Sequence, residues 1–140
     1  MKTESSAPKK KIINTKTASE IEIRNELCVR FGWTYEEEYH PYLNRKVTYY
    51  SHPVHTYDPI KKSYKIMEQP IRSSLENTLQ TFPYGYVFAG MEEMDDGRWI
   101  VVARRVEMTG PFDRIFAIAE NYITAVFRLA MMCWNDKEGT

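Results

Sequence analysis

The C-terminal half of the chain contains the pattern that most restricts its fold, which is two strand-like runs on either side of a turn signal. Residues 86–94 and 98–108 are separated by Asp95-Asp96-Gly97, and an Asp-Gly pair between such runs is a strong signal for a β-hairpin. Residues 99–102 form a nearly continuous apolar stretch, which is typical of a strand that is covered on at least one face. The sequence therefore predicts an antiparallel hairpin packed by other elements.

The segment that follows, 111–134, is predicted to form a long buried helix. Between Phe112 and Trp134 the only charged residues are Asp113, Arg114, Glu120 and Arg128. A helix that is apolar almost all round is buried in the centre of its domain or at an oligomer interface. A membrane span is the rival interpretation, but Glu120 and Arg128 near the middle of so short a run argue against it.

A first helix is expected at about 17–31. Thr17 and Glu20 have the spacing of a capping box, in which each side chain satisfies an orphan amide of the first turn. Gly32 follows at the position where a left-handed C-cap is favoured. The apolar residues between these two signals recur at helical spacing.

Another helical pattern covers about 58–82. It begins at Asp58-Pro59, where an N-cap oxygen is followed by a proline whose missing amide costs nothing in the first turn. Pro70 lies inside the pattern and cannot donate the hydrogen bond of a helix interior. We therefore expect a helix that is broken at Pro70, either as one kinked helix or as two helices nearly in line.

Seven of the ten tyrosines fall between positions 35 and 64. Tyrosine combines an apolar ring with a hydroxyl, so it suits an interface, a ligand pocket or the edge of a core. The segment has no sustained helical period, and only a short strand near 47–50 is expected within it. A loop this long inside a compact domain tends to be functional, which makes this segment our first candidate for a recognition surface.

Together these elements predict an α+β fold. Its small antiparallel sheet would contain the hairpin 86–94/98–108 and the short strand near 47–50, packed by the helices at about 17–31, 58–82 and 111–134. A chain of 140 residues is long enough for one domain with a hydrophobic core, and we expect this domain at 17–136. Residues 1–16 are rich in lysine and serine and are predicted to form a flexible basic tail.

This order of elements resembles the phage ABA sandwich domain, a family of small phage proteins, over about residues 17–134. The sequence segments that match are Phe31-Gly32-Trp33, Tyr49-Tyr50-Ser51, the helix from Asp58, the run Arg98-Trp99-Ile100-Val101-Val102, and Ala117, Ala119, Ala125 and Ala130 in the last helix. The resemblance implies an antiparallel sheet packed by helices and a viral origin. It supplies no catalytic residues. With only two cysteines, a reducing setting such as the host cytoplasm is expected.

Composition and motifs argue against several classes of function. Nineteen basic and nineteen acidic side chains cancel, so no global field favours nucleic acid or an anionic membrane. No glycine-rich phosphate loop follows a strand, and no Gly-x-Ser-x-Gly elbow is present. His52 and His55 with Asp58 and His40 are the most metal-like group, but a loop lacks the fixed geometry of a metal motif. We therefore expect no enzyme, cofactor or metal site, with a metal-dependent enzyme as the remote alternative.

Three binding or structural functions stay open. The first is a phage accessory protein that binds and interferes with a host factor through a tyrosine-rich surface. A second is a Tyr/Arg-lined pocket that sequesters a nucleotide-like host immune signal, and a third is a structural homo-oligomer joined through the 111–134 helix. The candidate binding residues for a partner or ligand are Tyr35, Tyr39, Tyr42, Arg45, Lys46, Tyr49, Tyr50, His55, Tyr57, Arg104 and Arg105.

Overall fold

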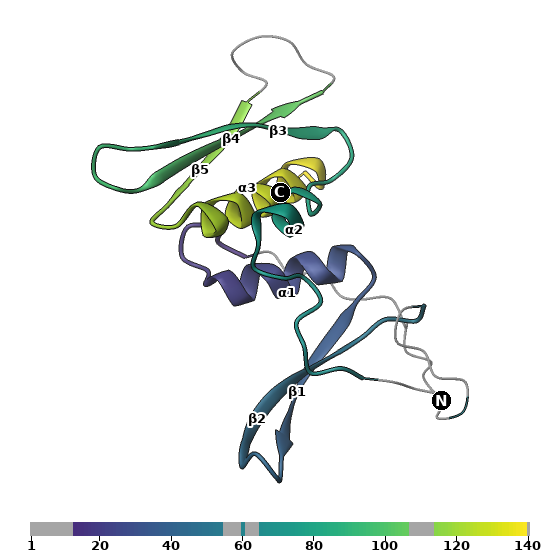
Figure 1. Cartoon of the computed structure of the whole chain (residues 1–140). Helices are drawn as coiled ribbons and strands as arrows, with labels where there is room; N and C mark the ends of the chain where they lie inside the picture. Colours follow the sequence, from purple (N-terminus) through teal and green to yellow (C-terminus); the bar gives the residue numbers. More distant parts are fainter. Residues whose placement is uncertain (1–12, 55–59, 61–64, 107–113, 140) are drawn as a thin grey trace. The chain divides into compact units, whose positions relative to one another are not determined.

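The computed structural model describes residues 13–54, 60, 65–106 and 114–139, which are the coloured parts of Figure 1. Two compact units are present. The hairpin unit comprises the described residues of 25–70, and the sheet unit comprises those of 13–24 and 71–139. Their helices and strands follow the order α1 (Glu20–Arg30), β1 (Thr34–His40), β2 (Arg45–Ser51), α2 (Leu75–Leu79), β3 (Tyr86–Glu93), β4 (Trp99–Arg105), β5 (Arg114–Ala119) and α3 (Tyr122–Lys137). The predicted α+β class is confirmed.

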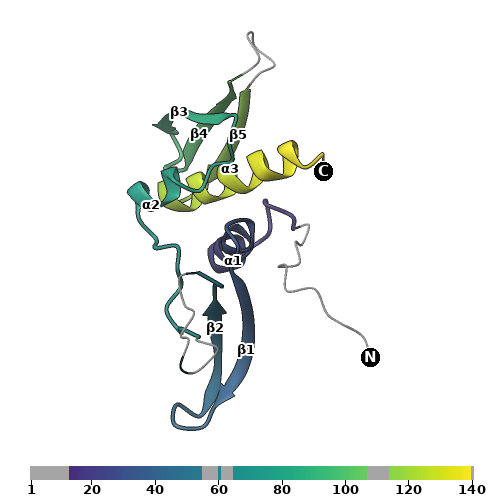
Figure 2. The ribbon, with the colours of Figure 1, turned by 90° about the vertical axis from the view of Figure 1, so that its right-hand side faces the viewer.

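The sheet unit is built on three antiparallel strands in the order β3-β4-β5. Figures 1 and 2 show α3 along one face of this sheet, with α2 on the same side. The side chains on that face alternate with those on the opposite face, as the pleat of a strand requires. The core between sheet and helix comprises Val101, Ala103, Ala117, Ala119, Ala125, Val126, Leu129 and Cys133.

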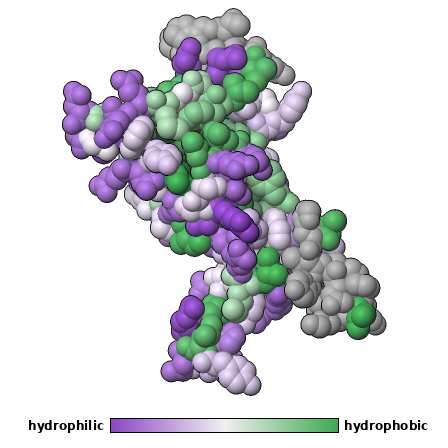
Figure 3. All heavy atoms as spheres, viewed as in Figure 1, coloured by the Kyte–Doolittle hydropathy of each residue, from purple (hydrophilic) through white to green (hydrophobic). Residues whose placement is uncertain are grey.

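The predicted hairpin is confirmed as β3 and β4. Gly97 has a φ of +86°, and its amide donates to the carbonyl of Met94 over 2.9 Å. A glycine in this left-handed conformation closes a three-residue hairpin loop without steric cost. Asp96 accepts from the backbone amide of Arg98 over 3.0 Å, and the hairpin's turn end is hydrophilic in Figure 3.

The predicted helix over 111–134 is wrong in its first part. Residues Arg114–Ala119 form β5, which pairs with β4, and the helix begins only at Tyr122. Ile115, Phe116 and Ile118 are β-branched or aromatic and suit a strand packed on a partner strand. Asn121 then starts the helix by accepting from the amide of Ile123 over 2.8 Å, as an N-cap does.

The apolar character of α3 is explained by burial within the sheet unit. Ala125, Val126 and Leu129 are fully buried in the core beneath β4 and β5. This burial removes the need for a shared core between subunits, which was the reason for expecting oligomerisation through this helix. Among the described helices, none is long and apolar enough to cross a membrane.

The helix predicted over 58–82 is largely wrong. Within the described part, only α2 at Leu75–Leu79 is helical, and its N-cap Ser74 accepts from the amide of Asn77 over 3.2 Å. Residues 65–74 are irregular, and Ile66 forms an isolated antiparallel bridge with Tyr50. Pro70 denies this stretch the hydrogen bond of a helix interior. The expected start at Asp58 lies outside the described residues.

The hairpin unit contains a second, separate sheet. The strand near 47–50 is confirmed as the middle of β2, but β2 pairs with β1 and not with the β3–β4 hairpin. Strand β1 was not predicted, because the glutamates at 36–38 break the apolar alternation that marks a half-buried strand. Five of its seven residues are exposed, so its pairing with β2, and not its own burial, places it in a sheet.

Helix α1 is confirmed, with one correction at its start. Ser19, and not Thr17, acts as the cap, since its hydroxyl accepts from the amide of Glu22 over 3.3 Å. At the other end the amide of Trp33 donates to Cys28 O and that of Gly32 to Val29 O, both over 3.1 Å. This is the Schellman pattern expected from Gly32, whose φ is +92°. Of the predicted tail 1–16, residues 1–12 lie outside the described part.

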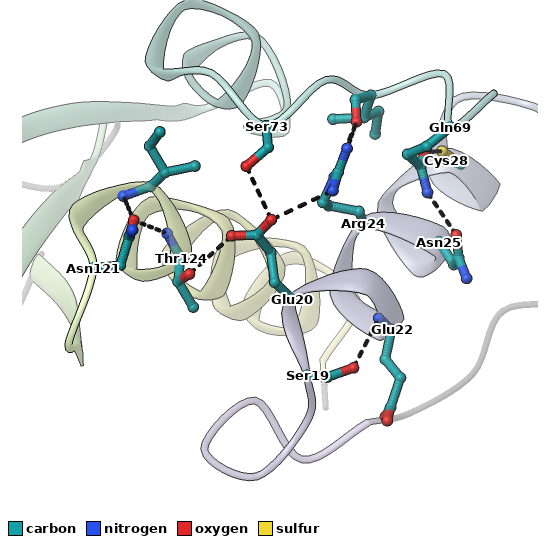
Figure 4. Close-up of polar contacts among 12 residues, drawn as sticks. Ser19, Glu20, Glu22, Arg24, Asn25, Cys28, Gln69, Ser73, Asn121 and Thr124 are labelled. Carbon is teal, nitrogen blue, oxygen red and sulfur yellow. Dashed lines mark hydrogen bonds and ion pairs between the residues drawn. The ribbon is translucent and has the colours of Figure 1, made fainter.

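The first turn of α1 is tied into the sheet unit by Glu20 (Figure 4). Its Oε1 atom accepts from the Thr124 hydroxyl of α3 over 2.8 Å. Its Oε2 atom accepts from the Ser73 hydroxyl over 3.0 Å and from Arg24 Nη1 over 3.4 Å. Arg24 in turn donates to the carbonyl of Ile71 over 2.6 Å. One carboxylate therefore links three segments of the sheet unit that are distant in sequence.

The core assignment predicts a clear difference between two leucines of the sheet unit. Leu129→Ala removes a fully buried side chain and should lower the free energy of unfolding by about 2–5 kcal/mol. Leu79→Ala removes an exposed leucine from α2 and should cost less than about 1 kcal/mol. Urea unfolding followed by circular dichroism measures both. Equal losses in the two variants would contradict the assignment.

Candidate functional site

The tyrosines of the hairpin unit divide into a buried group and an exposed group. Tyr50 is only 2% exposed, whereas Tyr39 is 59% and Tyr42 is 94% exposed. Tyr35 and Tyr49 are intermediate. His55 and Tyr57 lie outside the described residues, so their binding role stays a prediction. The division separates the tyrosines that build the unit from those that are available to a partner.

Tyr50 is an internal anchor of the hairpin unit. Its hydroxyl donates to Asn25 Oδ1 over 2.7 Å and accepts from Gln69 Nε2 over 3.0 Å. Gln69 also accepts from the Cys28 thiol over 2.9 Å (Figure 4), and the main chain of Tyr50 pairs with Ile66. Buried hydroxyl and amide groups must find such partners, so this network fixes strand β2 within its unit.

Tyr35 has a structural role at a buried carboxylate. Glu26 is 1% exposed; it accepts from the Tyr35 hydroxyl over 2.7 Å and from Arg30 Nη1 over 3.2 Å. Burial, followed by the bond to Glu26, raises the pKa of Tyr35 well above its usual value. The tyrosine therefore stays protonated and acts as a donor, which supports a charge that would be costly without partners.

Lys65 gathers the acidic side chains of β1. It forms ion pairs with Glu36 and with Glu38, the latter over 2.8 Å, and its ammonium lies 5.8 Å from the centre of the Tyr49 ring. The hydrogen bond from Lys65 lowers the pKa of Glu38, and the bonds to both glutamates raise the pKa of Lys65. This surface of β1 is thus occupied by a local charge cluster.

The exposed tyrosines lie at the tip of the β1–β2 hairpin, which we define as residues 39–46. Asn44 has a φ of +54°, a conformation that asparagine tolerates in turns, and its side chain accepts from the Tyr39 hydroxyl. His40 Nδ1 accepts from the amide of Leu43 over 3.1 Å. These bonds shape the loop while the rings of Tyr39 and Tyr42 stay exposed. Green apolar spheres stand among purple ones over this hairpin in Figure 3.

Two cationic side chains stand beside these rings. Arg45 is paired with His40 in the strand register and Lys46 with Tyr39, and both are exposed. The tip therefore combines aromatic rings, the apolar side chain of Leu43 and positive charge on one short hairpin. Of the predicted site residues that the structure describes, seven belong to the hairpin unit, and four of these lie at the tip. The seven are Tyr35, Tyr39, Tyr42, Arg45, Lys46, Tyr49 and Tyr50.

Arg104 and Arg105 belong to the sheet unit and point to opposite faces of β4. Arg104 pairs with Arg114 in the register on the face away from α3. Arg105 donates from Nε and Nη2 to the Asp136 carboxylate of α3, over 2.8 and 2.9 Å. This pairing lowers the pKa of Asp136. Burial and the neighbouring Asp136 raise the pKa of Tyr86, which donates to the same carboxylate, to about 12.

The described histidines and Cys28 have hydrogen-bond partners, and Cys133 is buried in the core of the sheet unit. His52 Nδ1 accepts from the amide of Val54, and Nε2 lies 3.0 Å from the carbonyl of Phe31. A single neutral tautomer satisfies both contacts. Burial raises the pKa of the Cys133 thiol to about 12, which keeps it from acting as a thiolate. Within the described ranges, no group of three His, Cys, Asp or Glu residues could hold a metal ion.

Two hollows of the sheet unit are lined by described residues. The larger, of about 910 Å³, follows β5 and contains Lys16, Arg98, Arg114 and Arg128. The smaller, of about 430 Å³, lies at the β3–β4 turn. Among the described residues that line these two hollows there is no tyrosine, and neither Arg104 nor Arg105. Sequence reasoning missed the larger hollow because it placed Arg114 and Arg128 on one helix.

Comparisons with protein-family models, with curated proteins and with solved structures find no match to this chain. The resemblance to the phage ABA sandwich domain therefore stays a prediction. The viral origin that it implies, and the cytoplasmic location expected from the two cysteines, likewise stay predictions.

The different roles of the tyrosines can be tested with conservative variants. Tyr35→Phe removes a donor from the buried Glu26 and should lower the free energy of unfolding by about 1–3 kcal/mol. Tyr42→Phe removes a hydroxyl from an almost fully exposed ring and should change it by less than about 0.5 kcal/mol. Chemical denaturation of both variants measures the difference. An unchanged free energy of unfolding in Tyr35→Phe would show that Glu26 does not need this donor.

The Arg105–Asp136 pair predicts a specific dependence of stability on pH. Since the pKa of Asp136 is lowered in the folded protein, the pair stabilises the protein above the unfolded carboxyl value of about 3.9. This contribution is lost as pH falls through the lower folded value. Asp136→Asn should therefore cost up to about 1 kcal/mol near neutral pH, as expected for an exposed pair, and less at about pH 2.

Denaturation midpoints of the wild type and Asp136→Asn, compared across this range, measure the effect. Asp95→Asn in the exposed β3–β4 turn is the matched control, and its difference from wild type should be small. A difference for Asp136→Asn that grows as pH falls would contradict the assigned role.

Proposed function

We propose that this chain is a non-catalytic binding protein that engages a protein partner through the tip of the β1–β2 hairpin. The observation that carries the proposal is the 94% exposure of Tyr42 at the end of a hairpin, next to Tyr39 and Leu43. Tyrosine is enriched among the residues that dominate binding energy, because its ring buries much area at a low entropic cost. An exposed ring on a protruding turn suits a protein surface better than an enclosed ligand.

The base of the hairpin supports this role. Tyr50 holds β2 through Asn25 and Gln69, and Tyr35 holds β1 through Glu26. A tip on an anchored base loses less conformational freedom on binding than a free loop does, and this preorganisation increases affinity. The unit therefore uses some of its tyrosines to position others.

The charges of the tip indicate the kind of surface it would bind. Arg45 and Lys46 add two positive charges beside the exposed rings. Charged residues at the rim of an interface increase the association rate and select complementary surfaces. We therefore expect a partner with an apolar pocket for Tyr42 that is bordered by acidic residues.

We further propose that the partner is a host protein and that binding interferes with its activity. The support for a viral role is the resemblance of the chain to small phage proteins. This part of the proposal is separate from the geometry of the tip, so a partner from another source would remove it and leave the binding surface in place.

Photo-crosslinking at position 42 tests the binding surface directly. Tyr42 is replaced with p-benzoyl-phenylalanine, and the full chain is irradiated in a bacterial lysate. We expect discrete protein adducts, identified by mass spectrometry. The same replacement at Tyr84, which is 91% exposed in the sheet unit, is the matched control and should give none of these adducts.

A pair of alanine variants then measures the contribution of the rings. Tyr39→Ala/Tyr42→Ala should weaken binding to the crosslinked partner at least about tenfold, since a central aromatic residue contributes about 2 kcal/mol or more. Tyr84→Ala should bind as the wild type does. Identical adducts at positions 42 and 84, or unchanged affinity of the double variant, would refute the proposed surface.

A further inference from the structure

A groove along β5 in the sheet unit has no part in the function proposed above. All six residues of Arg114–Ala119 line it, which makes it as long as the strand itself. The α3 side of the groove is formed by Thr124, Arg128 and Met132. These three residues recur every four positions and form one stripe of the helix. The groove, of about 910 Å³, thus runs between a strand and a helix, and its length suits an extended occupant.

Strand β5 is an edge of its sheet. β4 pairs with it on one side, and the described strands provide no partner on the other. An edge strand presents main-chain amides and carbonyls to which another strand can be added. Arg128 covers one of these groups, because its Nη1 atom donates to the carbonyl of Ile118 over 3.1 Å. A strand added at this edge would lie about 4.8 Å from β5, inside the groove.

The described residues that line the groove carry more basic than acidic side chains. Among them are Lys16, Arg98, Arg114 and Arg128, against one carboxylate, that of Glu120. Arg98 is also paired with Asp96 over 2.7 Å, which lies outside the groove. This excess of positive charge favours an acidic occupant.

Arg128 shows where an acidic group would be held. Its Nε atom is buried and has no hydrogen-bond partner among the described residues. A buried donor that lacks a partner costs free energy, and a guanidinium binds carboxylates with two parallel hydrogen bonds. A carboxylate in the groove beside Arg128 would therefore add a charge-assisted attraction.

Apolar contacts complete the surface. Phe116 is 56% exposed on the face of β5 away from α3, whereas Met132 lines the groove from the helix. An added strand points alternate side chains to the two faces of the sheet. Such a strand could contact Phe116 with one set of side chains and Met132 with the other.

We propose that the groove along β5 binds an acidic, extended polypeptide segment that joins the β3-β4-β5 sheet as a fourth strand. Main-chain hydrogen bonds to β5 provide part of the affinity, and Arg114 and Arg128 select acidic side chains. The site lies in the sheet unit, so it is independent of the hairpin tip, and either site can fail without the other.

The positive charge of the groove favours an acidic segment over two other possible occupants, the chain's own N-terminal residues and a second copy of β5. The chain's own residues 1–12 contain four lysines and one glutamate, so they would add positive charge to a positive groove. A second copy of β5 would add another Arg114 and no acidic residue within the strand. An acidic segment is the occupant that neutralises the groove.

A peptide-display selection tests the proposal with the full chain. Yeast displaying random peptides of about twelve residues is sorted for binding to the labelled protein. We expect enrichment of peptides that are rich in Asp and Glu. The best peptide is then synthesised, and its affinity is measured by fluorescence anisotropy at low and high salt, where higher salt should weaken binding.

Two variants and a modified peptide locate the site. Arg114→Glu, at an exposed position, should weaken binding at least about tenfold, as expected for the loss of a charge-assisted contact. Arg72→Glu exchanges an exposed arginine of the same unit outside the groove and should have little effect. N-methylation of alternate peptide amides should abolish binding, because it removes main-chain donors and leaves the carboxylates. Hydrogen exchange should slow at the amides of β5 when the unmodified peptide binds.

Each contrary result overturns a stated part of the proposal. Failure to enrich acidic peptides would refute the acidic occupant. Equal binding of the N-methylated peptide would refute strand addition and leave only charge attraction. Sedimentation showing a dimer that Arg114→Glu alters, with no peptide binding, would assign the groove to a second copy of the chain.

Discussion

The packing of α3 against one face of the β3-β4-β5 sheet is the interaction on which the sheet unit depends. Ala125, Val126 and Leu129 of the helix are fully buried together with Val101 and Ala103 of β4. Near its two ends, the helix forms polar contacts with other parts of the sheet unit. Thr124 bonds with Glu20 near its start, and Asp136 pairs with Arg105 near its end. The groove beside β5 is a further consequence, since one side of it is a stripe of the same helix.

The sequence predicted the elements that have strong local signals. The β3–β4 hairpin was predicted from Asp96-Gly97 in its turn. The end of α1 was predicted from Gly32, which adopts the expected left-handed conformation. The boundary between β5 and α3 was missed, since periodicity alone cannot separate an apolar strand from the buried helix that follows it. Asn121 was the available signal for that boundary, because it is a good helix N-cap.

The candidate site could be predicted only in part, and the reason is physical. Composition drew attention to the tyrosines, but the burial of Tyr50 depends on Asn25 and Gln69, which are remote from it in sequence. Tyr42 has the same chemistry and is almost fully exposed. No local pattern distinguishes these two residues. The groove was even less accessible to sequence reasoning, because its cationic residues come from separate elements that meet only in the folded unit.

The two edges of the three-stranded sheet differ in regularity, and this difference bears on how the protein would aggregate. In β3 one extra residue lies between Phe88 and Gly90, so the pairing with β4 is interrupted there. A bulge of this kind twists an edge and discourages the addition of strands. Strand β5 pairs with β4 without interruption. Misassembly into longer sheets would therefore be expected to begin at β5, where the positive charge of Arg114 would oppose pairing with a second copy of the strand.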